Sequence, residues 1–315
     1  MVTANEIRAA AEVIRSGGLV VFPTETVYGL GANACDSSAV QKIFALKGRP
    51  ASSPLIVHVG SIEQAQSLAA EWPEQAQQLA MRFWPGPLTI VLPKQNIIPD
   101  CVTAGLSTVG LRMPRNEIAL KLIHESGLPI AAPSANRFSQ LSPTTAQHVR
   151  DAFGNEAPMI LDGGPCEVGL ESTVVAIVDG LIEVLRHGMA IVNGATSALP
   201  ASEPGGGHRA PGLHAKHYSP RTKLVLVNQG SLPRARKGAY LTTNKVDADR
   251  ARLACQRVVL MPGQAAEYAA RLYETLHRLD REGLDWIAVA IPPQGAEWAA
   301  IHDRLTRAAS GALLG

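Results

Sequence analysis

Residues 19–50, LVVFPTETVYGLGANACDSSAVQKIFALKGRP, contain the pattern that decides the fold. The apolar run at 19–22 predicts a short buried strand, and a polar loop over 23–36 follows it. Val40, Ile43 and Phe44 then recur at helical spacing within 38–47, and Gly48 ends the predicted helix. A strand, a loop and a helix in succession predict an α/β fold.

The same alternation continues on both sides of this stretch. Before it, Thr3 and Glu6 have the spacing of a capping box, which predicts a helix that ends at Gly17. After it, we expect helices near 61–71, 73–83, 116–126 and 144–153, and strands at 54–59, 88–92, 109–113, 129–132, 159–162, 173–178 and 182–186. Residues 1–195 are therefore predicted to form one α/β domain with a mixed sheet.

The composition changes between residues 193 and 220, where Gly, Pro, Ser, Ala and His dominate and no hydrophobic period is visible. We interpret residues 196–221 as a linker. Beyond it, strands at 224–227, 239–241, 258–261 and 286–291 alternate with helices at 264–281 and 296–309. Residues 222–315 are therefore expected to form a smaller parallel-sheet domain.

Composition and charge exclude several classes of protein. Of the 315 residues, 46% are hydrophobic and 18% are charged, which excludes intrinsic disorder and fibrous repeats. The longest apolar runs are far shorter than a membrane span, and the N-terminal residues lack the pattern of a signal peptide, so we expect a cytoplasmic protein. Residues 1–195 contain 13 basic and 17 acidic residues, so no polybasic arm for nucleic acid is present in them.

Four loops carry hydroxyl, glycine and basic residues at the ends of predicted strands, where open α/β sheets usually bind ligands. They are PTETVYGLGA at 23–32, KGRPASSPLIVH at 47–58, APSAN with the following SQLSPTT at 132–145, and GLESTVVAI at 169–177. Arg112 and Arg186 lie on or at the ends of strands, where an unpaired charge is costly to bury, so we expect both to face an anion in a cleft. We expect neither Arg49 nor Arg186 to need its charge for the core.

Other sites of chemistry are weakly indicated or not indicated. The sequence has no GxxxxGK[ST] loop, no GxGxxG after the first strand and no GxSxG motif. The four cysteines form no CxxC pair, and His214-x-x-His217 has no third ligand nearby, so we predict no protein-bound metal. Bound phosphate must then be held by hydroxyls, backbone N–H groups and Lys or Arg side chains.

Together these segments resemble the YrdC/Sua5 family. FPTETVYGLGANA, KGRP, PLIVH, PGPLTIVL, VGLRMP, PSAN and ESTV occur in the order and spacing of its catalytic domain over roughly residues 5–195. APGLHAKHYSP resembles the linker of the longer, Sua5-type members, whose C-terminal domain is Rossmann-like. Ser52 and Ser53 depart from the Asp-Asn that the family commonly has before this proline.

The resemblance implies a nucleotidyltransferase that condenses L-threonine, bicarbonate and ATP into threonylcarbamoyl-AMP and pyrophosphate. This is the first step in the threonylcarbamoyl modification of adenosine 37 (t6A37) in tRNA, and it implies a downstream threonylcarbamoyl-transferring complex as partner. It also implies a YrdC-like twisted mixed sheet, and Mg²⁺ carried on the nucleotide. No residue with a covalent catalytic role is expected.

The resemblance also implies which residues contact each substrate. Around L-threonine it implies Thr26, His58, Arg112, Ala132 and Ser172. Around ATP it implies Lys47, Arg49, Ser53, Thr108, Ser134, Ser142, Arg186 and Tyr218, the last reaching back from the linker. Tyr28 and Asn136 are expected to support the site.

Three alternatives to this function can be weighed against the residues. A related carbamoyl-adenylate-forming maturation factor shares one such domain, but it is much longer and has zinc-finger cysteines. A double-stranded RNA-binding module would use a basic face for phosphate, which the acidic excess of residues 1–195 disfavours. A partner-binding role for the C-terminal domain is the third alternative, and the sequence does not decide between direct and no direct binding of tRNA.

Overall fold

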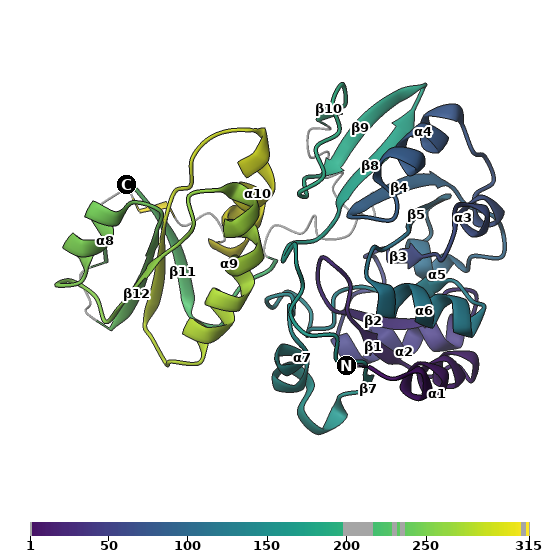
Figure 1. Ribbon diagram of the computed structural model, residues 1–315, viewed down its shortest axis with the longest axis horizontal. Coiled ribbons are helices and arrows are strands. Elements are labelled where there is room, and N and C mark those ends of the chain that lie inside the picture. Colours follow the sequence, from purple (N-terminus) through teal and green to yellow (C-terminus); the bar gives the residue numbers. More distant parts are fainter. Residues whose placement is uncertain (1, 198–216, 229–231, 234–236, 310–312, 315) are drawn as a thin grey trace. The chain divides into compact units, whose positions relative to one another are not determined.

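The structure is a computed structural model that describes residues 2–197, 217–228, 232–233, 237–309 and 313–314. The described residues fall into two compact units, each built on its own sheet (Figure 1). Unit 1 is drawn from Met1–Phe138, Pro143–Glu167 and Glu171–Leu213, and unit 2 from Ser139–Ser142, Val168–Leu170 and His214–Gly315.

Unit 1 contains a mixed sheet of ten strands in the order β10-β9-β8-β4-β5-β3-β6-β2-β1-β7. The strands are β1 (Val20–Phe22), β2 (Gly29–Asn33), β3 (Ile56–His58), β4 (Leu88–Pro93), β5 (Thr108–Arg112), β6 (Ile130–Ala131), β7 (Met159–Ile160), β8 (Thr173–Val178), β9 (Leu181–Arg186) and β10 (Thr196–Ser197). The helices are α1 (Ala4–Arg15), α2 (Ser37–Lys47), α3 (Ile62–Leu68), α4 (Glu74–Phe83), α5 (Asp100–Thr103), α6 (Glu117–Ser126) and α7 (Ala146–Phe153), with a 3₁₀ turn at Gly154–Glu156.

The sequence signals for the helix ends are confirmed where they are strongest. Thr3 accepts a hydrogen bond from the Glu6 N–H, and the Glu6 carboxylate accepts one from the Thr3 N–H, so the capping box starts α1 as expected. Gly48 adopts a left-handed conformation with φ 62° directly after α2, which a side chain with a Cβ would disfavour.

Successive strand residues point to opposite faces, and the central strands of unit 1 contribute to two separate cores. Val20 and Phe22 belong to a core with α1 and α6, whereas Val21 between them belongs to the larger core. Ile130 and Ala131 of β6 divide between the same two cores. Strands β1 and β6 are thus buried on both faces of the sheet.

The expected polar loop at 23–36 is wrong in its second half, where the structure forms β2. Glycine lowers strand propensity, so GLGAN gives no strand signal in isolation. The strand forms because it pairs antiparallel with both β1 and β6. A Cβ at Gly31 would lie 2.7 Å from the Phe22 ring and 2.8 Å from Ile130, so packing excludes a larger residue there.

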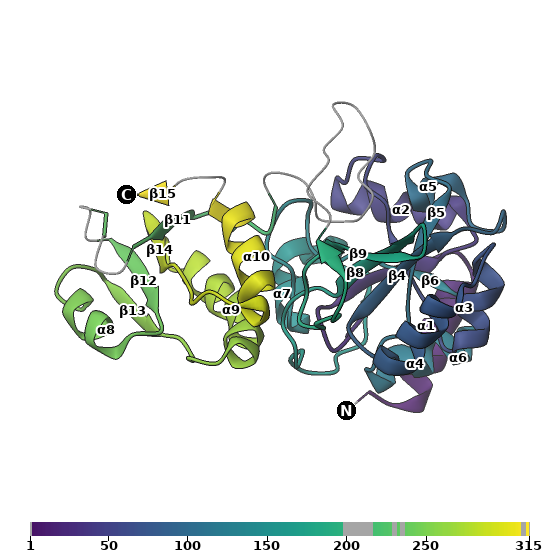
Figure 2. The same ribbon diagram turned by 90° about the horizontal axis from the view of Figure 1, so that it is seen from above.

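Unit 2 is a parallel five-stranded sheet in the order β13-β12-β14-β11-β15, with α8 on one side and α9 and α10 on the other (Figure 2). The expected parallel sheet is confirmed, because every pairing within it is parallel. Its elements are β11 (Lys223–Val227), β12 (Gly238–Thr242), α8 (Lys245–Ala251), β13 (Arg257–Leu260), α9 (Ala265–Asp280), β14 (Trp286–Ala290), a 3₁₀ turn at Ala296–Trp298, α10 (Ala299–Ala309) and β15 (Leu313–Leu314).

The α/β class and the mixed first sheet are therefore confirmed, while five short elements besides the 3₁₀ turns were not expected: β2, α5, α8, β10 and β15. Each is seven residues or shorter, too short to show a clear hydrophobic period. No helix among the described residues is both long enough and apolar enough to cross a membrane.

Candidate functional site

Five neighbouring strands of unit 1 bring polar residues to one edge of the sheet. β9 ends at Arg186, which pairs with Val174 near the start of the antiparallel β8, and Ser172 directly precedes β8. β4 runs parallel to β8, so Thr89 near its start lies at the same edge. β5 is antiparallel to β4 and ends at Arg112, which pairs with His58 at the end of β3. Four of the residues predicted around threonine or ATP therefore lie side by side at these strand ends: Arg186, Ser172, Arg112 and His58. Thr89, which was not predicted, lies between Ser172 and Arg112.

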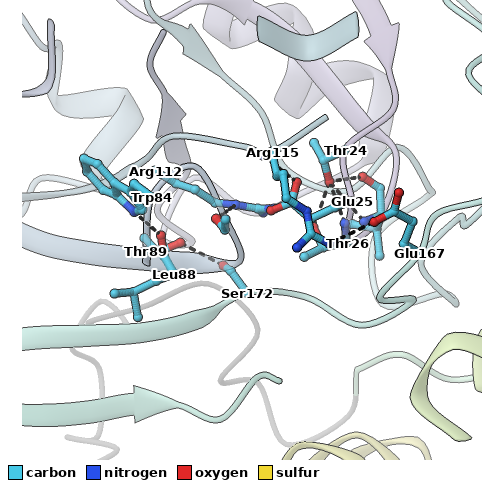
Figure 3. Close-up of polar contacts among 12 residues, drawn as sticks. Thr24, Glu25, Thr26, Trp84, Leu88, Thr89, Arg112, Arg115, Glu167 and Ser172 are labelled. Carbon is cyan, nitrogen blue, oxygen red and sulfur yellow. Dashed lines mark hydrogen bonds and ion pairs between the residues drawn. The ribbon is translucent and has the colours of Figure 1, made fainter. Parts of the chain in front are cut away.

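Ser172 and Arg186 are joined directly. The Arg186 guanidinium donates to the Ser172 carbonyl at 3.1 and 2.9 Å and to the Ser172 hydroxyl at 3.1 Å. The same hydroxyl lies 2.8 Å from the Thr89 hydroxyl, and Ser172 and Thr89 are fully buried (Figure 3). A residue predicted for ATP and one predicted for threonine thus form one hydrogen-bonded group.

Arg112 forms a buried ion pair with Glu25. Its Nη2 donates to Glu25 Oε1 at 2.8 Å and its Nε to the Gly86 carbonyl at 3.3 Å, and the two charged side chains are 4% and 2% exposed. Burial alone would raise the pKa of Glu25, but the charge and hydrogen bond of Arg112, with backbone N–H donors, hold that pKa below its usual value. Arg112 is therefore held by a fixed carboxylate.

The loop before β2 is ordered by its own polar groups (Figure 3). The Thr24 hydroxyl lies 2.8 Å from that of Thr26 and donates to the Val27 carbonyl at 2.7 Å. Glu25 Oε2 accepts the Arg115 N–H at 3.1 Å, and the Arg115 side chain pairs with the exposed Glu167 at 2.8 Å. Thr26 and Arg112 are therefore connected through the residue between the two threonines.

His58 is buried and kept neutral. Burial lowers its pKa to about 3, and the charge of Arg112 acts in the same direction. Its ring meets Phe22 edge to face at 5.9 Å between centroids. Its Nδ1 is buried and has no hydrogen-bond partner among the described residues. Such an atom is rare in folded proteins and calls for a partner.

Lys47 holds the segment that contains Ser134 and Asn136. Its ammonium donates to the carbonyls of both residues at 2.5 Å. Burial, followed by the charge of Arg49, lowers the Lys47 pKa well below its usual value. These three predicted site residues are brought together, with the cation at the end of α2.

Arg49 and Ser53 also lie together. Arg49 donates to the carbonyls of Ser53 at 3.4 Å and Pro54 at 3.0 Å, and its guanidinium stands 6.0 Å from the centre of the Phe138 ring. Arg49 and Arg186 are 8% and 5% exposed. The expectation that neither charge serves the core is wrong, because both guanidinium groups satisfy buried backbone carbonyls.

The remaining predicted residues lie apart from these strand ends. Thr108 begins β5, four residues and about 13 Å from Arg112 at its other end. The Ala132 N–H donates to the Ile56 carbonyl at 2.9 Å, two residues before His58. The Tyr28 hydroxyl donates to the Gly164 carbonyl at 2.7 Å, and burial raises its pKa.

Ser142 and Tyr218 belong to unit 2. The Ser142 carbonyl lies 3.1 Å from His277 Nε2, and the Tyr218 ring stacks on Tyr273 at 6.2 Å with the Arg304 guanidinium 4.9 Å from its centre. Most of the linker, residues 198–216 with His214, lies outside the described residues. The described part of the chain has no group of three or more His, Cys, Asp or Glu that could hold a metal ion.

Two residues of the site, Glu25 and Thr89, were missed from the sequence. Both stand inside quoted motifs, PTETVYG and PGPLTIVL. An acid flanked by threonines gives no sign that it pairs with an arginine 87 positions away. Thr89 lies in an apolar strand run, where its hydroxyl was the only signal.

Comparison with known proteins gives matches along almost the whole chain. The family model of Sua5, YciO and YrdC, described as telomere recombination, matches residues 12–188. A second model, described as the C-terminal domain of threonylcarbamoyl-AMP synthase, matches residues 178–310. The two matches follow one another along the chain.

Individual relatives agree with the family models. The threonylcarbamoyl-AMP synthase of Pyrococcus abyssi is 41% identical over 326 residues, covering 96% of this chain and 94% of that protein. The Bacillus subtilis protein of the same name is 39% identical over 332 residues, covering 98% and 94%. The crystal structure of P. abyssi Sua5 complexed with L-threonine superposes with a TM-score of 0.87 at 39% identity, covering 98% of this chain and 95% of that one.

Proposed function

The chain belongs to the Sua5–YciO–YrdC family, its activity is the synthesis of threonylcarbamoyl-AMP, and we propose how the residues of unit 1 divide that work. The reaction condenses L-threonine, bicarbonate and ATP, releases pyrophosphate and is the first step of t6A37 formation in tRNA. The match over the full chain also sets aside the related maturation factor.

One observation carries the assignment of the threonine site. Among the described residues, neither Nη1 of Arg112 nor Nδ1 of His58 has a hydrogen-bond partner, although the two residues pair across β5 and β3. Buried or partly buried polar atoms of this kind are normally satisfied, by a ligand if not by protein. Two such atoms on neighbouring strands support a polar ligand between them.

The charge and hydrogen-bonding capacity of each atom decide which group of threonine it binds. Arg112 takes the carboxylate, since a guanidinium is the natural partner of a carboxylate and Glu25 and Gly86 occupy only its Nη2 and Nε. His58 is neutral and accepts or donates one hydrogen bond through Nδ1. Thr26, Ala132 and Ser172 complete the pocket.

ATP is assigned to the cationic residues beyond this pocket. Lys47, Arg49 and Arg186 supply positive charge to the phosphates, with Ser53, Thr108 and Ser134 of unit 1 as further contacts. Tyr28 and Asn136 support them through the segments they hold. Ser142 and Tyr218, which belong to unit 2, stay predictions from the sequence. Phosphate oxygens near Lys47 favour its protonated form and would raise its low pKa.

The residues promote the reaction without a covalent intermediate on the protein. A carbamate formed on the threonine amine attacks the α-phosphorus of ATP, and pyrophosphate leaves. The reaction joins two anions, so its barrier falls when fixed cations cancel their repulsion and hold them in line. We assign this role to Arg112 for the threonine carboxylate and to Arg186 for the phosphates.

Two further assignments concern groups that come with the substrates or after them. We propose that Mg²⁺ is carried on the triphosphate and takes few protein ligands. The product, a mixed anhydride, passes to a threonylcarbamoyl-transferring complex. We also propose domain limits of 1–195 and 222–315, with 196–221 as the linker between them.

Threonine binding without ATP tests the site separately from the reaction. Calorimetry should detect L-threonine binding to the wild type and a loss of at least ~10-fold in His58→Ala, whose pocket lacks the Nδ1 atom. Equal affinity in both would remove His58 from the site.

A further inference from the structure

Two hydroxyls and one guanidinium form a hydrogen-bonded group at the strand ends of the unit 1 sheet. Ser172 Oγ lies 2.8 Å from Thr89 Oγ1 (Figure 3). It lies 3.1 Å from Arg186 Nη2. Within the described residues, Ser172 is the only hydrogen-bond partner of the Thr89 hydroxyl. Both hydroxyl residues have no exposed surface.

One of the two hydroxyl hydrogens in this group has no acceptor within the group. A guanidinium only donates, so Ser172 Oγ must accept from Arg186. The contact between the two hydroxyls uses the hydrogen of one of them. Whichever hydroxyl donates, the hydrogen of the other has no acceptor in the described chain, and a buried donor without an acceptor is unfavourable.

The position of each hydroxyl decides where the spare hydrogen belongs. Thr89 lies inside β4 between β5 and β8, and its methyl carbon would be 3.1 Å from a Cβ at Gly110. Ser172 lies in the loop just before β8, beside the residues assigned to threonine. Ser172 is therefore the hydroxyl at the strand end, on the side of the proposed substrate, whereas Thr89 is packed within the sheet.

We propose that Thr89 is a positioning residue that donates to Ser172 and thereby directs the Ser172 hydroxyl hydrogen to an anionic oxygen of the substrate. Ser172 then accepts from Arg186 and from Thr89 with both lone pairs, so its only remaining capacity is to donate. Carboxylate and carbamate oxygens are the acceptors that the reaction supplies. The inference deepens the proposed threonine site and rests on it.

Two substitutions at position 89 separate the effect of the hydroxyl from the effect of the branched shape of the side chain. Thr89→Val keeps the branched shape and removes the donor, and Thr89→Ser keeps the donor. We expect Thr89→Val to raise the KM for L-threonine by about 10-fold with a smaller change in the KM for ATP, and Thr89→Ser to restore it to within about 3-fold. Thr103→Val is the matched control, because the buried Thr103 hydroxyl donates to the Leu106 carbonyl and to no residue of the site.

A double-mutant cycle then tests the route through Ser172. If Thr89 acts only through the serine, Thr89→Val should have no further effect on threonine KM in a Ser172→Ala background. The proposal would be overturned if Thr89→Val had the same effect on the threonine KM with and without Ser172. It would also be overturned if Thr89→Val alone left the threonine KM unchanged or lowered it, because the serine would then donate to Thr89. Failure of the wild type to bind threonine would instead refute the proposed site itself.

Discussion

The buried pair of Arg112 and Glu25 gives Arg112 two roles, and they can be separated by substitution. The side chains of Arg112 and Glu25 are 4% and 2% exposed, and Nη2 of Arg112 lies 2.8 Å from Oε1 of Glu25. Removing one partner of such a pair leaves a buried charge and destabilises a protein by about 3–5 kcal/mol. Arg112→Met and Glu25→Gln should therefore each lower the free energy of unfolding by a few kcal/mol.

The double variant, Arg112→Met with Glu25→Gln, removes both charges and nearly keeps both volumes. We expect it to be more stable than Arg112→Met alone, because no uncompensated carboxylate remains buried. Urea unfolding followed by tryptophan fluorescence measures this coupling. Arg115→Met is the control, since its ion pair with Glu167 is exposed and contributes about 0–1 kcal/mol.

Threonine affinity should follow a different pattern from stability. Both variants without Arg112 lose the partner of the carboxylate, which weakens binding at least ~10-fold by calorimetry. Glu25→Gln keeps the arginine and removes its competing anion, so its folded fraction should bind threonine at least as tightly as the wild type. Wild-type affinity in the double variant would refute the assignment of Arg112, and additive losses of stability would refute the pairing argument.

Three further outcomes are expected. Between its ordinary pKa of 6.5 and its folded pKa of about 3, His58 is protonated in the unfolded state but not in the folded state, so the free energy of unfolding falls as the pH is lowered through this range. In urea unfolding, the loss of stability between pH 7 and pH 5 should be roughly 2 kcal/mol smaller in His58→Gln than in the wild type. An equal loss in both would contradict the buried neutral ring. Lys47→Met should weaken ATP binding at least ~10-fold, whereas Lys42→Met on the same helix, whose ammonium donates to the Gly17 carbonyl, should not; equal affinities would exclude Lys47 from the phosphates. Truncation after Asn193, or Tyr218→Ala, should impair synthesis or speed loss of the adenylate in a mass-spectrometric time course, and full activity of the truncated chain would reduce the linker to a tether.

Much of the fold could be predicted from the sequence because its long elements carry their own signals. The capping box of Thr3 and Glu6 and the glycine after Lys47 are local features, and each determines a helix end wherever the helix packs. β2 could not be predicted in this way, since its glycines are explained only by Phe22 and Ile130 packing against them. A strand that depends on its neighbours leaves no periodic signal.

The sequence predicted which side chains belong to the site better than it predicted what those side chains bind. Arg112 and Arg186 were expected to face a cleft because a charge at a strand end needs an anion. Glu25, which meets that need for Arg112, and the carbonyl of Ser172, which accepts from Arg186, are brought there by strand order. Sequence spacing does not encode strand order, so a fixed structural partner and a substrate could not be told apart.

The activity itself is tested most directly by omitting one substrate at a time. The purified chain is incubated with ATP, L-threonine and bicarbonate, and pyrophosphate and the adenylate are followed by mass spectrometry. We predict that threonylcarbamoyl-AMP and pyrophosphate form together, and that both disappear when either threonine or bicarbonate is left out. Pyrophosphate release that persists without threonine, or turnover of ATP to ADP and phosphate, would contradict this account.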